Sequence, residues 1–166
     1  MPYLAIQSML DGGAAHGMHY YWKSHRLPKF TDDVIDIVLS GVDTITSPFS
    51  QIAGWAMGGA ASRVAADATA VGEREIGFEL NITAAWAPGS AEPHVAWVRQ
   101  RSEELRPYSV GVYANFLSDE DAAGVRAAYG DRLTRLTALK DRYDPGNVFR
   151  MNANIAPSGA DRSDRR

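Results

Sequence analysis

The sequence predicts an α+β fold in which an antiparallel sheet carries helices on one face. Segments with strand character are interrupted by segments of helical spacing, and no glycine-rich phosphate-binding loop follows a strand. A chain of 166 residues with 45% hydrophobic content can bury a sizeable core as one globular domain.

The first half of the chain predicts three strands and one helix. Residues 1–10 are apolar and end in the turn Asp11-Gly12-Gly13, and the aromatic-rich residues 20–24 predict a strand. Thr31 is expected to cap a helix. Apolar residues with helical spacing follow this cap: Val34, Ile35, Val38, Leu39 and Val42. Residues 50–57 and 76–86 predict two more strands, and the small residues of 58–71 predict a tight bend or a close backbone approach between them.

The second half is predicted to be mainly helical. Pro93 opens a helix that ends at Arg106-Pro107, and residues 110–116 predict a short strand. Ser118 precedes a helix with acidic residues 119–121 in its first turn, where they favour the positive end of the helix dipole. A further helix stops at Asp144-Pro145-Gly146-Asn147, and residues 158–166 are expected to form a disordered tail.

Composition argues against several classes of function. Seventeen Lys and Arg against twenty Asp and Glu give a net charge of -3, which argues against binding to nucleic acid. The absence of cysteine excludes disulfides, thiolate-bound zinc and flavin attachment through a thiol of this chain. No apolar run reaches the roughly 20 residues that span a bilayer, and no export signal is recognised. A soluble, cytoplasmic protein is therefore expected.

The histidines and serines do not predict a metal site or a hydrolase. His16 and His19 flank Gly17 in a loop, without the helical spacing of paired metal ligands. A Gly-x-Ser-x-Gly nucleophile elbow is absent from the sequence.

Residues 139–157 resemble the C-terminal signature of flavin-linked oxidases of the berberine-bridge-enzyme type. Other motifs of that family follow in order: Pro2-Tyr3 with Gln7, Tyr21-Trp22-Lys23-Ser24, Gly58-Gly59, Thr69-Ala70 with Arg74, Phe78-Glu79-Leu80 with Trp86, His94-Val95-Ala96-Trp97-Val98-Arg99, and Tyr113-Ala114-Asn115-Phe116. The chain is thus similar to the C-terminal half of an FAD-linked oxidase of the vanillyl-alcohol-oxidase and p-cresol-methylhydroxylase superfamily.

The resemblance implies a domain organisation and a cofactor. Residues 1–117 would form the substrate-binding domain, an antiparallel sheet with helices, and residues 118–157 a berberine-bridge-like segment packing on it. The cofactor would be FAD, although the family's pyrophosphate-binding loops and flavin-attachment histidine have no counterpart in this sequence. The chain is expected to start inside a larger architecture. Its implied partners are a small-molecule substrate and either an N-terminal FAD-binding half or further copies of itself.

Two residues are candidates for catalysis. Tyr113 matches a family tyrosine that faces the flavin and removes a proton while the substrate carbon gives up hydride. A phenol has a reference pKa near 10, so this role needs a nearby positive charge or donated hydrogen bonds. Glu79 matches an acidic residue that serves as base or electrostatic partner, and strand periodicity places it on the polar face. The alternatives are an interior tyrosine with a satisfied hydroxyl and a solvated carboxylate.

Five further residues are candidates for binding. Trp55 and Gln51 would line the substrate cavity, with a core position as the alternative for Trp55. Three amides are assigned to the flavin edge because each offers a donor and an acceptor: Asn115, Asn152 and Asn154. Backbone capping is the alternative for the last two.

The function expected from these residues is the substrate-binding and C-terminal portion of an FAD-dependent oxidoreductase. It would oxidise a hydroxylated or aromatic small molecule by hydride transfer to flavin. The alternative, from a different class, is a flavin-free binding or assembly module derived from the same domain.

Overall fold

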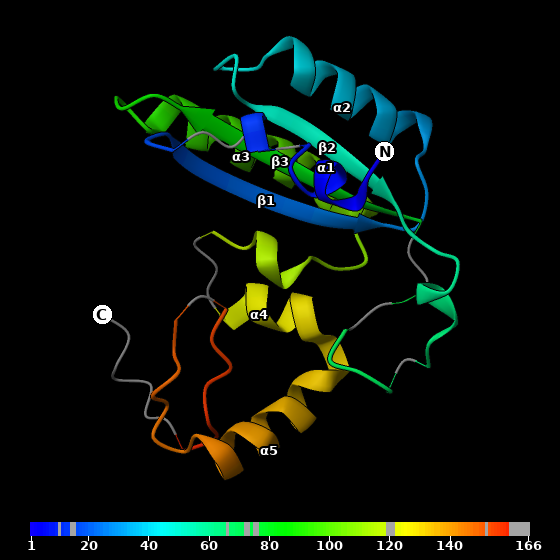
Figure 1. Cartoon of the computed structure of the whole chain (residues 1–166), viewed down its shortest axis with the longest axis vertical. Helices are drawn as coiled ribbons and strands as arrows, with labels where there is room; N and C mark the ends of the chain where they lie inside the picture. Colours follow the sequence, from blue (N-terminus) through cyan, green and yellow to red (C-terminus); the bar gives the residue numbers. More distant parts are fainter. Residues whose placement is uncertain are drawn as a thin grey trace.

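The sheet of the protein is antiparallel, as the sequence predicts. The computed structural model describes residues 1–9, 11–13, 16–65, 67–71, 74, 77–118, 122–151 and 153–159. Within these residues, the sheet has three strands in the order β1 (His19–Leu27), β3 (Phe78–Trp86) and β2 (Gln51–Ala56). Both pairings are antiparallel, and with the helices they confirm the α+β class (Figure 1).

Two helices, α2 (Asp32–Asp43) and α3 (Glu92–Leu105), cover one face of the sheet. As predicted, Thr31 caps α2 by accepting a hydrogen bond from the Val34 N–H, at 3.4 Å. The indole N–H of Trp97 on α3 donates to the Gly41 carbonyl on α2 at 3.2 Å and ties the two helices together.

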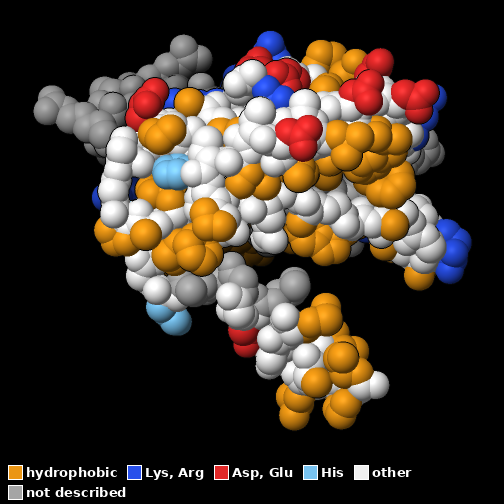
Figure 2. Space-filling view, turned by 90° about the horizontal axis from the view of Figure 1, so that it is seen from above, with side chains coloured by type: hydrophobic (Ala, Val, Ile, Leu, Met, Phe, Trp, Pro, Cys, Tyr) orange, Lys and Arg blue, Asp and Glu red, His pale blue; other side chains and the backbone are white. Residues whose placement is uncertain are grey.

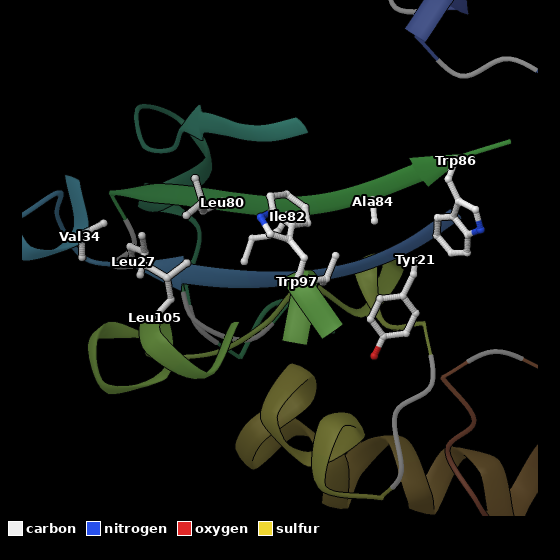
Figure 3. Close-up of a cluster of buried hydrophobic side chains, with 10 residues drawn as sticks. Tyr21, Leu27, Val34, Leu80, Ile82, Ala84, Trp86, Trp97 and Leu105 are labelled. Atoms are coloured by element: carbon white, nitrogen blue, oxygen red, sulfur yellow. The ribbon is translucent and has the colours of Figure 1, made fainter. Parts of the chain in front are cut away.

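The hydrophobic core lies between these helices and the sheet (Figure 3). Leu80, Ile82 and Ala84 point to this side from β3, because alternate residues of a strand share one face. The other buried members come from β1, α2, α3 and the end of β3: Tyr21, Leu27, Val34, Trp86, Trp97, Val98 and Leu105. Burial of these side chains leaves the opposite face of the sheet available for other uses.

Residues 109–118 run along the outer edge of β1. The Val110 N–H donates to the Arg26 carbonyl at 2.9 Å, and the Arg26 N–H donates to the Gly111 carbonyl at 2.8 Å. The predicted strand at 110–116 is nevertheless wrong. The pairing is a single isolated bridge, because the Tyr113 N–H turns to the Ser24 hydroxyl at 2.9 Å and residues Ala114–Phe116 form a 3-10 turn.

The chain ends with α4 (Ala122–Tyr129) and α5 (Leu133–Tyr143), below the sheet in Figure 1. The predicted stop after Tyr143 is confirmed, because Asp144 accepts from the Val148 N–H at 2.8 Å and the Phe149 N–H at 3.1 Å. Asn147 has a φ of 51°, which suits asparagine better than most residues. The acidic residues 119–121 lie outside the described residues.

Two segments extend beyond the sheet and its helices. A short helix, α1 (Tyr3–Gln7), is fully exposed, and its hydrophobic side chains form a lobe that projects from the body (Figure 2). The second segment follows β2, and its predicted bend is confirmed by positive φ angles at Gly58 and Gly59. Further along this segment, the Asp67 carbonyl accepts a hydrogen bond from Arg135 of α5 at 3.1 Å.

At the other end of the chain, Ser158 donates from its backbone N–H to Asp141 at 2.7 Å. The rest of the predicted tail, from residue 160, lies outside the described residues. No helix in the described part of the chain is long and apolar enough to cross a bilayer.

Candidate active site

The sheet face opposite α3 carries the polar side chains. Glu79 on β3 lies between two cross-strand neighbours, Arg26 on β1 and Trp55 on β2. Period-two alternation puts further residues on the same face: Trp22, Ser24, Gln51, Asn81 and Thr83. Glu79, Trp55 and Gln51 therefore share one face. The sequence predicted the polar face for Glu79 but did not predict that Trp55 and Gln51 would share it.

Tyr113 joins this face from the segment along the edge of β1. Its ring meets the Phe116 ring edge-on at 5.2 Å between centroids, and Phe116 stacks on Trp55 at 5.8 Å. The Asn115 amide donates to the Tyr113 hydroxyl at 2.9 Å. Tyr113 is half-buried, next to aromatic and polar groups. The fold thus brings the candidate tyrosine next to one predicted amide and one predicted cavity residue.

Glu79 is buried, with only 6% of its surface exposed, so the expected alternative of a solvated carboxylate is wrong. Its Oε2 accepts from the Arg26 Nε at 3.1 Å, and both side chains are shielded from water. Burial raises the pKa of the Glu79 carboxyl above its ordinary value, whereas Arg26 and the Ser24 hydroxyl oppose this shift. Among the described residues, no hydrogen-bond partner reaches the Glu79 Oε1.

Arg26 is the main residue that sequence reasoning missed. Its guanidinium carbon lies 5.7 Å from the centroid of the Tyr113 ring, within the range of a cation–π interaction. Alternation along residues 20–27 would have put Arg26 on the polar face with Trp22 and Ser24. No pattern in the sequence indicated that Arg26 pairs with Glu79, 53 residues away, or that it approaches Tyr113. Phe116, which bridges Tyr113 and Trp55, was missed for the same reason.

Trp55 is 42% exposed, which rules out the core position that was its alternative. β2 is an edge strand of the described sheet, and alternation turns Trp55 away from the helices. Gln51, four residues earlier, is exposed and faces the same way, opposite Thr83. Whether either residue contacts a substrate stays a prediction.

The predicted amides lie along two cavities. Asn115 lines one of about 430 Å³ with Trp22, Met151 and Ala153, so the tyrosine segment and the C-terminal segment meet there. Asn154 instead lines a cavity of about 360 Å³ against α5, also bordered by Met151 and Ala153. Asn152 lies outside the described residues.

Each of these amides has the chemistry to meet the edge of a flavin ring, although Asn115 and Asn154 line different cavities. The Asn154 Oδ1 is buried without a partner among the described residues, and Asn115 is exposed beside the Tyr113 hydroxyl. Both could therefore exchange hydrogen bonds with a ring system that carries donors and acceptors. The fit is confined to this edge, because the sequence offers no pyrophosphate-binding loop.

A larger cavity of about 850 Å³ lies on the other side of the edge of β1, and His25 is part of its wall. His25 is buried, and its Nε2 lies 2.9 Å from the Ser102 hydroxyl. Within the described residues, no group of three histidine, aspartate or glutamate side chains could hold a metal ion.

The chain is similar to FAD-linked oxidoreductases in both sequence and fold. Residues 112–156 match the family model for berberine and berberine-like proteins. The FAD-linked oxidoreductase YgaK of Bacillus subtilis is 36% identical over 61% of this chain and 23% of its own length. An FAD-linked oxidoreductase of Dictyostelium discoideum is 25% identical over 95% of this chain and 35% of its own length.

The solved structures agree with this relationship. The flavoenzyme CrmK, involved in shunt product recycling in caerulomycin biosynthesis, superposes with a TM-score of 0.76 at 25% identity. The match covers 95% of this chain and 37% of CrmK. Residues 112–156 thus match a berberine-like domain, and the chain is similar to part of the C-terminal portion of FAD-linked oxidoreductases. It spans between about a quarter and a third of the length of the curated relatives it matches.

Proposed function

We propose that this chain supplies the substrate side of an FAD-dependent oxidoreductase that oxidises a hydroxylated or aromatic small molecule. The observation that supports this proposal best is the position of Tyr113. The phenol is half-buried on the polar face of the sheet, with a cation beside its ring and an amide donating to its hydroxyl. These are the two conditions under which a tyrosine can act as a base.

In the proposed reaction, Tyr113 takes the proton of the substrate hydroxyl as the adjacent carbon loses hydride. Bound FAD would supply the two-electron acceptor for that hydride, which would leave a carbonyl compound as the product. Trp55 and Phe116 offer aromatic surface on which a ring or a sugar face can stack. Asn115 would hold the hydroxyl of Tyr113 toward the reacting carbon.

The relatives provide a way to test this proposal, because the FAD-binding part can come from one of them. The chain would be joined to the preceding portion of YgaK, and loss of the oxidised flavin colour would be followed with a panel of alcohols, sugars and phenols. We expect Tyr113→Phe to slow flavin reduction by about a hundredfold or more, the usual effect of losing a general base.

Tyr3→Phe is the matched control, because Tyr3 lies on the exposed helix α1 and its hydroxyl accepts a hydrogen bond from the neighbouring Gln7. This variant should reduce flavin at the parental rate. A Tyr113→Phe hybrid as fast as its parent would contradict the assignment of Tyr113. A hybrid that holds FAD but is reduced by no member of the panel would contradict the proposed substrate class.

A second candidate function is a flavin-free binding or assembly module, which the exposed apolar side chains favour. Met1, Leu4, Val148, Phe149 and Met151 are each at least 75% exposed. Monomeric proteins rarely leave large apolar patches in water. This function predicts self-association of the purified chain, and light scattering that gives a monomer mass at all concentrations would eliminate it.

A further inference from the structure

The two edges of the sheet differ in how their backbone groups are used. The edge of β1 is covered, because Val110 and Gly111 bond to both backbone groups of Arg26. The edge on the other side is β2, which pairs only with β3 among the described strands. An uncovered strand edge presents N–H and carbonyl groups that can pair with a further strand.

The register shows which backbone groups of β2 point outward. The Met57 N–H donates to the Gly77 carbonyl at 2.8 Å, which extends the register of β2 and β3 by one pair. Successive residues of an antiparallel strand direct their backbone groups to opposite sides, so Ile52, Gly54 and Ala56 direct theirs away from β3. Within the described part of the chain, no hydrogen bond engages these outward groups.

The sequence of β2 lacks the features that usually protect an edge strand from pairing. Residues Gln51–Ala56 include no charged side chain and no proline, and they pair with β3 without a bulge. Gly54, in the middle of the strand, has no side chain that would hold a second backbone at a distance. A further strand can therefore pair along the whole of β2.

Helix α2 presents apolar side chains on the same side of the molecule. Ile35, Leu39 and Val42 are 41%, 58% and 49% exposed and recur at helical spacing on one flank, and they form the α2 stripe. The opposite flank faces α3, because Ser40 accepts from Arg101 there at 2.9 Å. Since α2 contacts β2 whereas α3 covers β1 and β3, the α2 stripe faces outward beyond β2 (Figure 1).

We propose that β2 and the α2 stripe form one interface, and that its partner is a second copy of this chain. A two-fold axis through Gly54 would pair the outward groups of Ile52 with those of Ala56 of the second copy, and reciprocally. The strands of both copies would then form one continuous antiparallel sheet. The two α2 helices would lie side by side on its helical face, with one α2 stripe packed on the other.

The distribution of charge favours a second copy as the partner. In a two-fold contact each surface meets itself, so a charged surface would repel its own copy. Neither β2 nor the α2 stripe carries a charge. Asp32, Asp36 and Asp43 lie on the outer face of α2, which helical periodicity turns away from the sheet. The surface is therefore self-complementary.

The proposal goes beyond the oxidoreductase and gives the assembly module a specific interface, so it rests on the self-association which that second function predicts. Sedimentation equilibrium of the purified chain over a range of concentrations tests it, and we expect a monomer–dimer equilibrium. Leu39 is the middle residue of the α2 stripe, so Leu39→Lys brings two like charges together at the axis. We expect this variant to weaken the dimer by roughly tenfold or more.

Two further variants locate the contact. Gly54→Pro removes the outward N–H at the centre of β2 without removing a bond to β3, so it should also weaken the dimer. Leu139→Lys is the matched control for Leu39→Lys, because Leu139 is an exposed leucine on α5 that lies instead beside Phe149 and Met151. It should dimerise as the parent does. If Gly54→Pro does not fold, Leu39→Lys decides alone.

Hydrogen exchange of the backbone amides, followed by NMR, gives a second readout. The N–H groups of Ile52, Gly54 and Ala56 should exchange rapidly in dilute samples and more slowly as the dimer forms. Protection of these amides in a monomeric sample would show that another segment of the chain covers β2, and would overturn the proposal. In the hybrid with YgaK, a monomer in which they are protected would assign this edge to the YgaK portion, with the same consequence.

The failure of this interface can be distinguished from the failure of the assembly module. A chain that is monomeric at every concentration rejects both. A dimer weakened by Leu139→Lys but not by Leu39→Lys keeps the assembly module and rejects this interface. A dimer weakened by Leu39→Lys and unaffected by Leu139→Lys supports the interface, whatever the flavin hybrid shows about Tyr113.

Discussion

Lowering the pH should destabilise the fold through His25, which is 5% exposed. Burial, reinforced by the positive charge of Lys23, lowers the pKa of His25 to about 4, while Ser102 opposes this effect. The cavity wall beside the ring also carries Arg99, Glu103 and Arg106. Among the described residues, the second ring nitrogen, Nδ1, has no partner that would stabilise an imidazolium.

The sign of the effect follows from the protons bound by each state. In the unfolded chain the histidine titrates near pH 6.5, so between about pH 6.5 and pH 4 the unfolded state binds a proton that the folded state does not. The stability from His25 is complete above this window and is lost as the pH falls through it. From about pH 7.5 to about pH 5 the expected loss is about 2 kcal/mol of unfolding free energy.

Urea unfolding, followed by circular dichroism at several pH values, would measure this loss. The parent chain is compared with His25→Gln, which carries no titrating group at that position, and with His16→Gln, which removes an exposed histidine. The His25→Gln variant should show a shallower fall in unfolding free energy below about pH 6.5, whereas His16→Gln should follow the parent. Other groups that titrate, including Glu79, are present in the parent and in both variants, so their contribution cancels when the pH dependences of the unfolding free energy are compared. Parallel curves for the parent and His25→Gln would refute the reasoning.

Two further substitutions test local packing and the turn after α5. A Cβ on Gly77 would lie 2.3 Å from the Pro28 carbonyl oxygen, whereas one on Gly89 would meet its nearest neighbour at an ordinary 3.7 Å. Gly77→Ala should therefore cost about 2 kcal/mol in urea unfolding and Gly89→Ala much less, and equal costs would contradict the clash. Asp144→Ala should lower the urea midpoint, because it removes the acceptor for the Val148 and Phe149 N–H groups and the partner of Lys140. Lys140 holds the pKa of Asp144 below its ordinary value, so the stability it contributes is present above about pH 4 and is lost at lower pH. The loss of stability caused by Asp144→Ala should thus become smaller at acidic pH. A loss that does not change with pH would exclude a contribution from the Asp144–Lys140 ion pair.

The elements that the sequence predicted well are those with local causes. Thr31 accepts the hydrogen bond expected of a helix cap, and Asp144 with the residues after it ends α5 as their types require. These interactions join residues a few positions apart, so the order of residue types is enough to predict them. The prediction at residues 110–116 failed because its outcome depended on Ser24, 89 positions away.

In the candidate site, too, the sequence predicted what depends on local pattern and missed what depends on distant contacts. Period-two alternation put Glu79 on the polar face of its strand, and the cross-strand register then adds Trp55 and Gln51 to that face. It could not predict that Glu79 would be buried, because Glu79 is paired with Arg26, which lies 53 positions away in the sequence. Burial of a strand residue depends on what covers the strand, and here that cover comes from distant parts of the chain.

The same hydrogen bonds that close the edge of β1 also build the candidate site. An open strand edge presents unpaired N–H and carbonyl groups, which proteins usually cover. Here Val110 and Gly111 cover the groups of Arg26, and the Ser24 hydroxyl holds the backbone of Tyr113. The position of Tyr113 is therefore fixed by the sheet and by residues directly before it. It follows that the placement of Tyr113 beside Arg26 can be studied in this chain alone.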